Sequence, residues 1–323
     1  MKRLIAYIRG GLGDVWPAVC AIKSIIEKYN IPKFNVLIFT DSVYYFRNNY
    51  PKKLENYSLD MLRKISPNVI EISPLQNDNF NLTIDDTSDD FSQETADLYL
   101  NEFMFWRPIS LKDYFLRFID KDTIFIDSLC TECILQWDFE NHQYKRVSDE
   151  RAIIEFNPPV FEKNIIDKLL FDLGHKVVIQ VRIREETNQT KFGVGYYNDL
   201  ISFLNKNYIT PILIGIDMQN LEGDYIDWRE GNIGNNMLSF EGMGYLLSNC
   251  NIMIGDGSGL SLMKLYDQNQ DNLLILNVSR WRTNWWDRAI KDKANYYIFD
   301  GTKEDNLEKI KEKIEEYFIF KNG

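Results

Sequence analysis

Residues Arg3–Asp14 read RLIAYIRGGLGD, and this stretch decides the fold. Its first half, Arg3–Ile8, predicts a β-strand, and the glycines that follow predict a tight turn. Apolar side chains then recur at helical spacing from Val15 to Tyr29, and the short apolar run Phe34–Phe39 predicts a second strand. A strand, a turn, a helix and a second strand in this order indicate a parallel sheet with right-handed crossovers.

The rest of the chain repeats this style after a break at Phe156-Asn157-Pro158-Pro159. Paired prolines interrupt regular structure, so we expect a domain boundary between residues 157 and 158. The second half carries predicted strands at Lys176–Arg182 and Asn251–Gly255, and it ends in the charged amphipathic helix Lys303–Phe318. The sequence therefore predicts an α/β chain of two similar domains, and small-molecule sites favour the cleft between such domains.

The composition narrows the class of protein. Of the 323 residues, 45% are hydrophobic and 26% are charged, which excludes a wholly disordered chain. The net charge of −11 disfavours nucleic acid as a partner. No apolar run reaches the ~20 residues that span a bilayer, and the run after Met1-Lys2-Arg3 is too short for a signal peptide. We expect a soluble, cytoplasmic protein without a transmembrane segment.

The cysteines give little support for a metal centre. Cys130 and Cys133 form a C-x-x-C pair, and His142 lies near them in the sequence. A structural zinc site usually has four ligands, and no fourth ligand is apparent. We predict ordinary reduced cysteines and no metal site.

The glycine turn after the first strand is the first candidate site. Gly11 and Gly13 let the backbone approach a ligand closely, although the G-G-x-G spacing matches neither the dinucleotide fingerprint nor the P-loop. Asp14 follows at the expected helix start, where an aspartate commonly caps the helix. A carboxylate at the mouth of a cleft also suits general-base catalysis, and both interpretations stay open.

Three cations gather at the strand predicted to end at Arg182. Arg182 and Arg184 come at the strand end, and Lys191 lies on the loop that follows. Arginine binds phosphate in a bidentate manner and lysine acts as a point charge, so this cluster in an acidic chain favours a diphosphate. The alternative is that the arginines pair with Glu185 or Glu186.

A second glycine-rich turn follows the strand predicted at Asn251–Gly255. Its candidate anion-binding residues are Asp256, Gly257, Ser258, Gly259 and Ser261. Backbone amides and the serine hydroxyls suit phosphate oxygens, whereas simple helix capping by either serine is the alternative. The density of glycines exceeds what a cap needs and favours the anion site.

An aromatic stretch at Arg280–Arg288 follows another predicted strand. Its tryptophans suit stacking on a sugar or a base, and they suit equally well the covering of a surface between domains.

These motifs occur in the order found in a known family. With G-G-x-G-D after the first strand, Lys191-Phe192 after the cationic strand end and the late turn Gly257–Ser261, the chain resembles the family 9 glycosyltransferases. These are lipopolysaccharide heptosyltransferase-like enzymes with the GT-B fold. The resemblance runs from Leu4 to about Val278 and is strongest from Leu238 to Ser261.

The resemblance implies two Rossmann-like domains with a central cleft. Residues 1–157 would bind the acceptor, residues 158–302 would bind the nucleotide-sugar, and residues 303–323 would form a helix that packs back toward the first domain. It also implies an inverting, metal-independent transfer with no cofactor besides the nucleotide-sugar co-substrate.

The family also implies roles for particular residues. Asp14 would deprotonate the acceptor hydroxyl, Lys191 would contact the donor phosphate, and Glu241 would hold the donor ribose. Ser258, Gly259 and the neighbouring amides would bind the diphosphate. Each role fits the chemistry, because the hydroxyl needs a base and the leaving group needs charge stabilisation.

The chain departs from the family pattern at three positions and leaves the donor open. Gly257, Leu262 and Phe192 stand where the family usually has aspartate, histidine and tryptophan. The strand end Val181–Glu185 also looks like the arginine region of GT-B fucosyltransferases, so the donor is either ADP-heptose-like or a GDP-sugar.

Two other kinds of GT-B protein remain as alternatives to a transferase. One is a nucleotide-sugar epimerase or hydrolase, and the other is a degenerate binding protein. For a transferase, the acidic chain favours a neutral glycan, a peptide or a small-molecule acceptor. The expected acceptor loops are Asp78–Gln93 and Leu129–Ser148.

Overall fold

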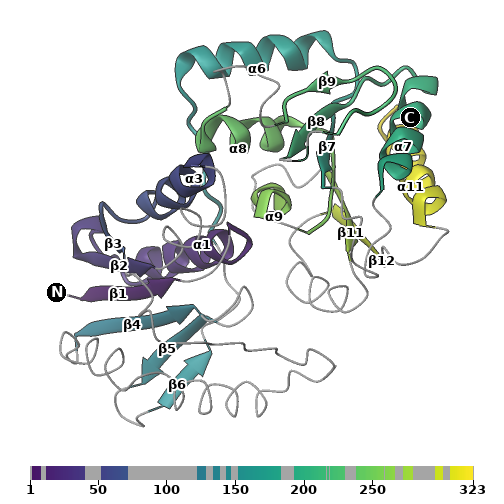
Figure 1. Cartoon of the computed structure of the whole chain (residues 1–323). Helices are drawn as coiled ribbons and strands as arrows, with labels where there is room; N and C mark the ends of the chain where they lie inside the picture. The colour runs from purple at the N-terminus through teal and green to yellow at the C-terminus, as the bar shows by residue number, and fades with distance from the viewer. Residues whose placement is uncertain are drawn as a thin grey trace. The chain divides into compact units, whose positions relative to one another are not determined.

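The computed structural model describes the chain in segments, shown as ribbons in Figure 1. They are residues 2–8, 12–40, 52–71, 122–128, 134–138, 143–146, 152–182, 193–215, 217, 219–229, 238–257, 259–265, 272–278, 295–300 and 306–322. The chain divides into two compact units, Met1–Ala152 (unit 1) and Ile153–Gly323 (unit 2). The division falls just before the prolines at which the sequence predicts a boundary.

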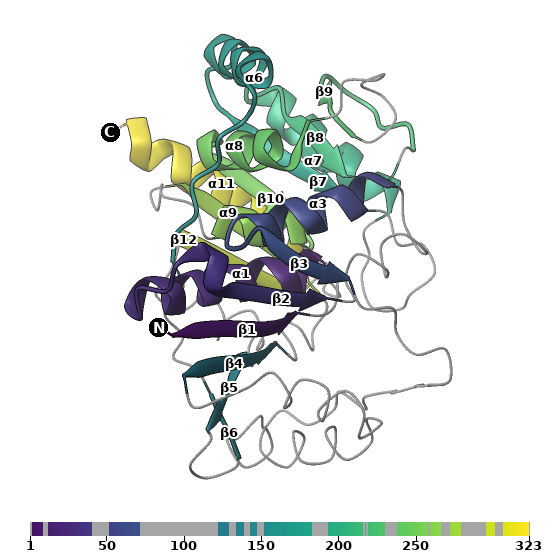
Figure 2. The same cartoon turned by 90° about the vertical axis from the view of Figure 1, so that its left-hand side faces the viewer.

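Unit 1 is built on a six-stranded sheet in the order β3-β2-β1-β4-β5-β6, which can be followed in Figure 2. The strands are β1 (Arg3–Ile8), β2 (Val36–Thr40), β3 (Asn68–Glu71), β4 (Thr123–Ser128), β5 (Ile134–Asp138) and β6 (Gln143–Arg146). The described helices are α1 (Leu12–Lys28), the 3-10 helix η1 (Lys33–Asn35) and α3 (Lys52–Arg63). β1 to β4 run parallel, which confirms the predicted parallel sheet.

The central strand β1 lies inside the unit, which explains its sequence. Leu4 and Ala6 on one face are fully buried, and Ile5 and Tyr7 on the other face are only 6% and 5% exposed. A strand buried on both faces is apolar without alternation. α1 packs on β1 and against α3, and its Val19 and Ile22 are fully buried as well. The apolar spacing of the sequence therefore marks the face that α1 buries.

Two antiparallel strands extend this sheet beyond its parallel part. β5 pairs antiparallel with β4 and with β6, so that Trp137 lies opposite Tyr144. The sequence predicted a loop over Leu129–Ser148, and that prediction is wrong for the residues of β5 and β6. Both strands are short and rich in polar residues, which antiparallel strands near a sheet edge tolerate because one face can meet water. The other expected acceptor loop, Asp78–Gln93, lies outside the described residues.

Unit 2 contains a second six-stranded sheet, in the order β12-β11-β10-β7-β8-β9, and all its pairs are parallel. The strands are β7 (Val177–Val181), β8 (Ile212–Gly215), β9 (Ile226–Asp227), β10 (Ile252–Gly255), β11 (Leu273–Val278) and β12 (Asn295–Asp300). The helices are α6 (Val160–Asp172), α7 (Val194–Lys206), α8 (Phe240–Asn249), α9 (Gly259–Leu265) and α11 (Asn306–Asn322).

The strand order of unit 2 is that of a doubly wound Rossmann sheet. Counted along the chain from β7, the strands lie in the order 6-5-4-1-2-3, which is 3-2-1-4-5-6 seen from the other edge. The order reverses between β7 and β10. Folds of this kind bind ligands at the carboxyl ends of the strands beside such a switch point.

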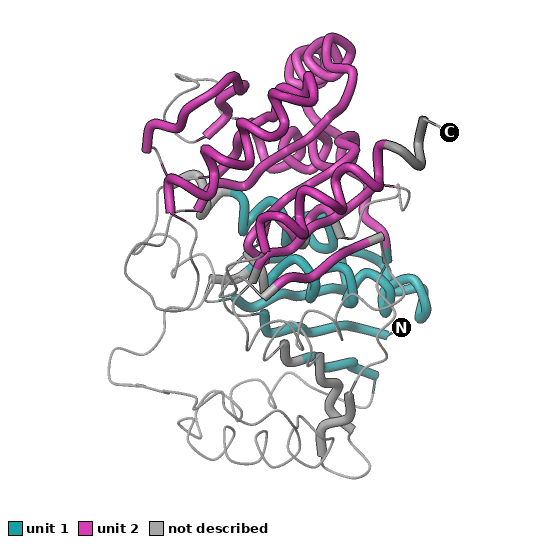
Figure 3. The backbone as a smooth tube through the Cα atoms, turned by 90° about the vertical axis from the view of Figure 1, so that its right-hand side faces the viewer, with its two compact units in different colours: residues 1–152 teal, residues 153–323 magenta. Residues whose placement is uncertain are grey.

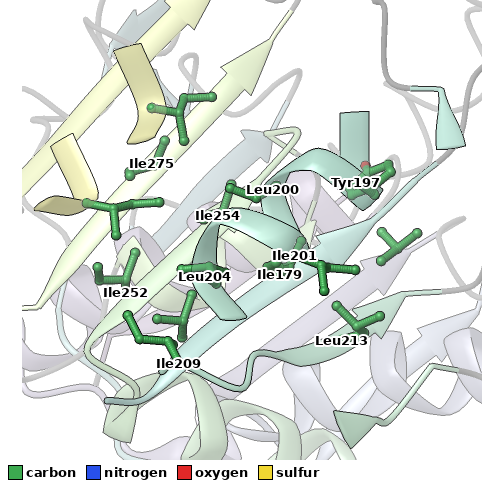
Figure 4. Packing of buried hydrophobic residues seen from close by; sticks show 14 of the residues in the cluster. Ile179, Tyr197, Leu200, Ile201, Leu204, Ile209, Leu213, Ile252, Ile254 and Ile275 are labelled. Atoms are coloured by element: carbon green, nitrogen blue, oxygen red, sulfur yellow. The ribbon is translucent and has the colours of Figure 1, made fainter. Parts of the chain in front are cut away.

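One face of this sheet is sealed by a hydrophobic core. Val177, Ile179 and Val181 point to the same face of β7, because side chains alternate along a strand. They pack with residues of α7, of which Leu200 and Leu204 are fully buried; Figure 4 shows α7 residues against the strands. The alternate residues of β7 therefore point to the opposite face, away from this core.

The C-terminal helix α11 belongs to unit 2, as its colour in Figure 3 shows. Ile310, Ile314 and Tyr317 join the core that covers β7, and α11 packs against α7 and β11. The C-terminal helix therefore packs as part of unit 2, and its predicted return toward the first domain stays a prediction. Among the helices in the described segments, none is long and apolar enough to cross a membrane.

Candidate functional site

The carboxyl edge of unit 2's sheet carries an ion pair at the switch point. Arg182 directly follows β7, and Asp256 directly follows β10, the strand beside it. Nη1 of Arg182 lies 3.1 Å from Oδ2 of Asp256. The arginine side chain is 34% exposed and the aspartate side chain 6%, so the acid is the buried partner. The guanidinium is held from one side and open to solvent on another.

The side chains on this face of β7 are tied to the turn after β10. Gln180 and Arg182 alternate with the core residues and point away from them. Ser261 of α9 is fully buried and donates its hydroxyl to Gln180 Oε1 at 3.1 Å. A Cβ on Gly255 would collide with Ser261 Oγ, so only glycine fits at the end of β10. Ser261, predicted to contact phosphate, thus bonds to β7 and fixes the turn.

The turn between β10 and α9 favours a glycine at position 257. Gly257 has φ +77°, the left-handed region that side chains disfavour, and Gly259 begins α9. The turn lets the chain reverse directly after Asp256. Backbone conformation therefore explains the glycine at position 257 of this predicted anion-binding turn.

A tyrosine from α7 binds the backbone at the end of β7. The Arg182 amide donates to Tyr197 Oη at 2.9 Å, and the same hydroxyl lies 3.2 Å from the Arg182 carbonyl. Burial raises the pKa of the Tyr197 phenol well above its ordinary value. The hydroxyl therefore stays protonated and can both accept and donate.

The start of α8 contains Glu241, the residue that the family resemblance assigns to the donor ribose. Its Oε2 accepts a hydrogen bond from the Asn157 amide at 2.7 Å. Phe156 beside it packs edge-on against Phe240, and a Cβ on Gly244 would collide with the Phe156 ring. In this structure Glu241 holds Asn157, close to the beginning of unit 2.

The helix start itself is capped from within the unit. Ser239 Oγ accepts from the Gly242 amide at 3.0 Å and donates to Glu162 Oε2 at 2.7 Å. Glu162, from α6, is buried and also accepts from the Ser239 amide. A carboxylate therefore occupies the region where α8 presents its amides.

The structure adds a buried arginine that the sequence patterns did not single out. Arg229 is 1% exposed and binds both carboxylate oxygens of Asp227, at 2.9 and 2.6 Å. Its Nη1 donates to the carbonyls of Asp217 and Gln219, which follow β8. This arginine fixes the loop at the carboxyl end of β8, beside the end of β7. An Asp-x-Arg triplet is too common to signal this role.

In unit 1, Asp14 is the third residue of α1, because the helix begins at Leu12. The expectation that Asp14 stands at the helix start as its N-cap is therefore wrong, and Gly13 is helical too. Both residues lie in the first turn after β1, at the carboxyl edge of the unit 1 sheet.

Other predicted site residues lie outside the described segments. They are Gly11, Arg184, Lys191, Ser258 and the aromatic stretch Arg280–Arg288. Cys130, Cys133 and His142, for which no metal site was predicted, also lie outside the described segments.

Comparison with known proteins identifies the fold. No protein-family model matches the sequence, and no curated protein matches it. Among solved structures, the chain is similar to a family 9 glycosyl transferase from Veillonella parvula, with 11% identity and a TM-score of 0.50 over 97% of this chain and 91% of that chain. It is also similar to the ADP-heptose LPS heptosyltransferase II of E. coli, with 12% identity and a TM-score of 0.53 over 99% and 100% of the two chains. The chain has the GT-B fold of these glycosyltransferases.

Proposed function

We propose that this protein is a glycosyltransferase that moves a sugar from a nucleotide-sugar donor to an acceptor hydroxyl. The fold supports this class, since both similar structures are glycosyltransferases by name. The observation that carries the proposal is the position of Arg182: a half-exposed cation at the switch point of the unit 2 sheet, in an acidic chain.

The donor diphosphate is the ligand that this position suits. A guanidinium has five N–H donors, and the Asp256 contact at 3.1 Å uses a single nitrogen, Nη1. Arginine binds phosphate through two parallel hydrogen bonds. Arg182 can therefore bind two phosphate oxygens while Asp256 fixes the orientation of the guanidinium. Arg184 and Lys191 follow in the sequence and would add charge to the same site.

The proposed reaction is a single displacement at the anomeric carbon. The acceptor oxygen forms a bond to that carbon, and the bond from the carbon to the diphosphate oxygen breaks. Asp14 takes the proton of the acceptor hydroxyl, and the electron pair leaves with the nucleoside diphosphate. Arg182 stabilises the charge that develops on this leaving group. Attack from the opposite face inverts the anomeric configuration, and no metal ion takes part.

The nucleoside end of the donor remains a choice between two classes. The E. coli protein is named for ADP-heptose, whereas the arginine after β7 favours a GDP-sugar by its likeness to fucosyltransferases. Glu241 would contact the donor ribose, as the family resemblance implies. The proposed acceptor is a neutral glycan, a peptide or a small molecule.

A panel of nucleotide-sugars tests the proposal. ADP-, GDP- and UDP-sugars are added separately, and the melting temperature of the full chain is measured. One class is expected to raise it, because a ligand at 100 times its Kd stabilises the folded state by about 2.7 kcal/mol. The responding donor is then incubated without acceptor. Rapid release of nucleoside diphosphate or epimerised donor would favour the hydrolase or epimerase alternative, and no response from any donor would favour a binding protein.

A further inference from the structure

We propose that Tyr197 is a positioning residue for Arg182: its hydroxyl holds the backbone from which the arginine reaches the donor diphosphate. This inference rests on the proposed function, since it assigns to Tyr197 a part in the same donor site. It rests on the hydrogen bonds at the end of β7, on the burial of Tyr197 and on the position of Arg182 between two anchors.

The hydroxyl continues the backbone bonding of β7 after the sheet ends. The pairing of β7 with β8 ends at Val181, opposite Gly215. The next amide, that of Arg182, donates to Tyr197 Oη at 2.9 Å. The phenol oxygen also lies 3.2 Å from the carbonyl of Arg182 and 3.4 Å from that of Gln180, so its single proton serves one of these acceptors. Tyr197 thus takes the place of a further strand partner.

The position of this hydroxyl is set by the core. Tyr197 is 2% exposed and packs among the residues of α7 and the sheet, as Figure 4 shows. Its ring touches that of Tyr196 edge-on at 5.2 Å between centroids. A phenylalanine would fill the same space with the same ring. The hydroxyl therefore contributes contacts to the end of β7 that the packing of the ring does not need.

Arg182 is consequently held at two points, its backbone and its guanidinium. Tyr197 fixes its backbone from the side of α7, and Asp256 fixes its guanidinium from the side of the turn after β10. A binding arginine that is placed in advance loses less freedom when a ligand arrives. If Tyr197 acts in this way, its contribution to ligand binding must pass through Arg182.

A double-mutant cycle tests this dependence. The full-length protein, Tyr197→Phe, Arg182→Ala and the double variant are titrated with ADP, GDP and UDP by calorimetry, each at one fixed ionic strength. Tyr245→Phe is the matched control, because its hydroxyl also makes a hydrogen bond, to Asp167 Oδ1 at 2.8 Å, on a different helix. Melting temperatures are recorded for every variant.

We expect Tyr197→Phe to weaken binding of the preferred nucleotide by up to about tenfold, the equivalent of one hydrogen bond. In the Arg182→Ala background the same change is expected to alter binding by less than about twofold, and Tyr245→Phe is expected to leave binding unchanged. The inference would be overturned if Tyr197→Phe reduced nucleotide affinity equally in the unsubstituted protein and in Arg182→Ala. It would also be overturned if Tyr197→Phe alone caused no loss of affinity, or if that variant failed to fold. If nucleotide binding weakened in Arg182→Ala but not in Tyr197→Phe, the proposed function would stand without this inference. If the unsubstituted protein bound no nucleotide, the proposed function and the inference would both be overturned.

Discussion

Arg182 and Asp256 are 74 residues apart in the sequence, yet Nη1 of the arginine lies 3.1 Å from Oδ2 of the aspartate. They follow β7 and β10, the neighbouring strands between which the order of the unit 2 sheet reverses. Because the aspartate is buried and the arginine half-exposed, the acid serves as a fixed anchor for a cation that faces solvent. This relationship places a guanidinium, a group suited to phosphate, where doubly wound folds bind their ligands.

The first prediction concerns the geometry of the guanidinium. Arg182→Lys keeps the positive charge but loses the fork that binds two oxygens, so nucleoside diphosphate affinity is expected to fall roughly tenfold. Titration calorimetry measures the change. Arg63→Lys is the control, since Arg63 forms an exposed pair with Asp60 on α3. Equal affinity for the unsubstituted protein and Arg182→Lys would show that a point charge is sufficient.

The second prediction concerns the buried arginine of unit 2. Arg229→Met removes the partner of the Asp227 carboxylate and four hydrogen bonds of the side chain, two of them to backbone carbonyls after β8. We expect a loss of about 3–5 kcal/mol in the free energy of unfolding, as for a broken buried pair. Urea unfolding provides the measurement. Lys313→Met, which breaks a solvent-screened pair with Glu316, is expected to change stability far less; similar effects of the two changes would contradict the assigned role.

The third prediction compares two glycines of unit 2. Gly215 ends β8 with φ +124°, and a Cβ there would collide with the backbone oxygen of Val181. Gly215→Ala is therefore expected to destabilise the protein by about 2 kcal/mol or more, through strain and displacement of the end of β7. A Cβ on Gly174 would meet no atom of the described residues within 4 Å, so Gly174→Ala is expected to be neutral within about 0.5 kcal/mol. Thermal unfolding of the two variants should separate them clearly, and equal melting temperatures would refute the close approach.

The fourth prediction is a loss of stability at alkaline pH. Burial raises the pKa of Tyr196 to about 12, and burial raises the pKa of Tyr197 well above its ordinary value. The unfolded chain releases these protons near pH 10 while the folded chain keeps them, so stability is fully present below about pH 10 and falls as the pH rises toward about 12. Tyr196→Phe is expected to remove on the order of 2 kcal/mol of this loss. Urea unfolding at several pH values tests it, with the exposed Tyr208 changed to phenylalanine as control; an unchanged alkaline slope in Tyr196→Phe would contradict the prediction.

The fifth prediction separates catalysis from donor binding. Asp14→Asn removes the proposed base, so acceptor-dependent release of nucleoside diphosphate is expected to fall by about a hundredfold or more. The donor affinity is expected to stay unchanged, because Asp14 lies in unit 1 and the proposed diphosphate contacts of Arg182 lie in unit 2. Retained turnover in this variant would exclude Asp14 as the base.

Much of the fold could be predicted from local patterns in the sequence. β1 has its predicted bounds, Arg3–Ile8, and α1 begins at Leu12, before the expected Val15. Buried parallel strands and the helices beside them carry strong apolar periodicity, so their existence is readable from short windows. The edge strand β6 and its neighbour β5 were missed because short antiparallel strands with polar residues lack this signal.

The contacts that build the candidate site join residues that are far apart in the sequence, so no short stretch of sequence predicts them. The sequence offered Glu185 or Glu186 as partners of Arg182, whereas the described partner is Asp256, which only the strand order brings near. Ser261 was expected to meet phosphate, and that role stays a prediction; the hydrogen bond of its hydroxyl to Gln180 on β7 could not be read from the sequence. Arg229 was overlooked because its importance comes from complete burial, which a charged residue in a polar stretch does not suggest.

The most direct test of the central claim is the binding of nucleoside diphosphates to the unsubstituted protein and to Arg182→Ala. ADP, GDP and UDP are titrated into each at the same ionic strength. The proposed donor site predicts that at least one of them binds the unsubstituted protein, and that Arg182→Ala weakens this binding roughly ten- to a hundredfold through the lost charged hydrogen bonds. Binding of none of the three, or equal binding to both proteins, would contradict a donor site at the Arg182–Asp256 pair.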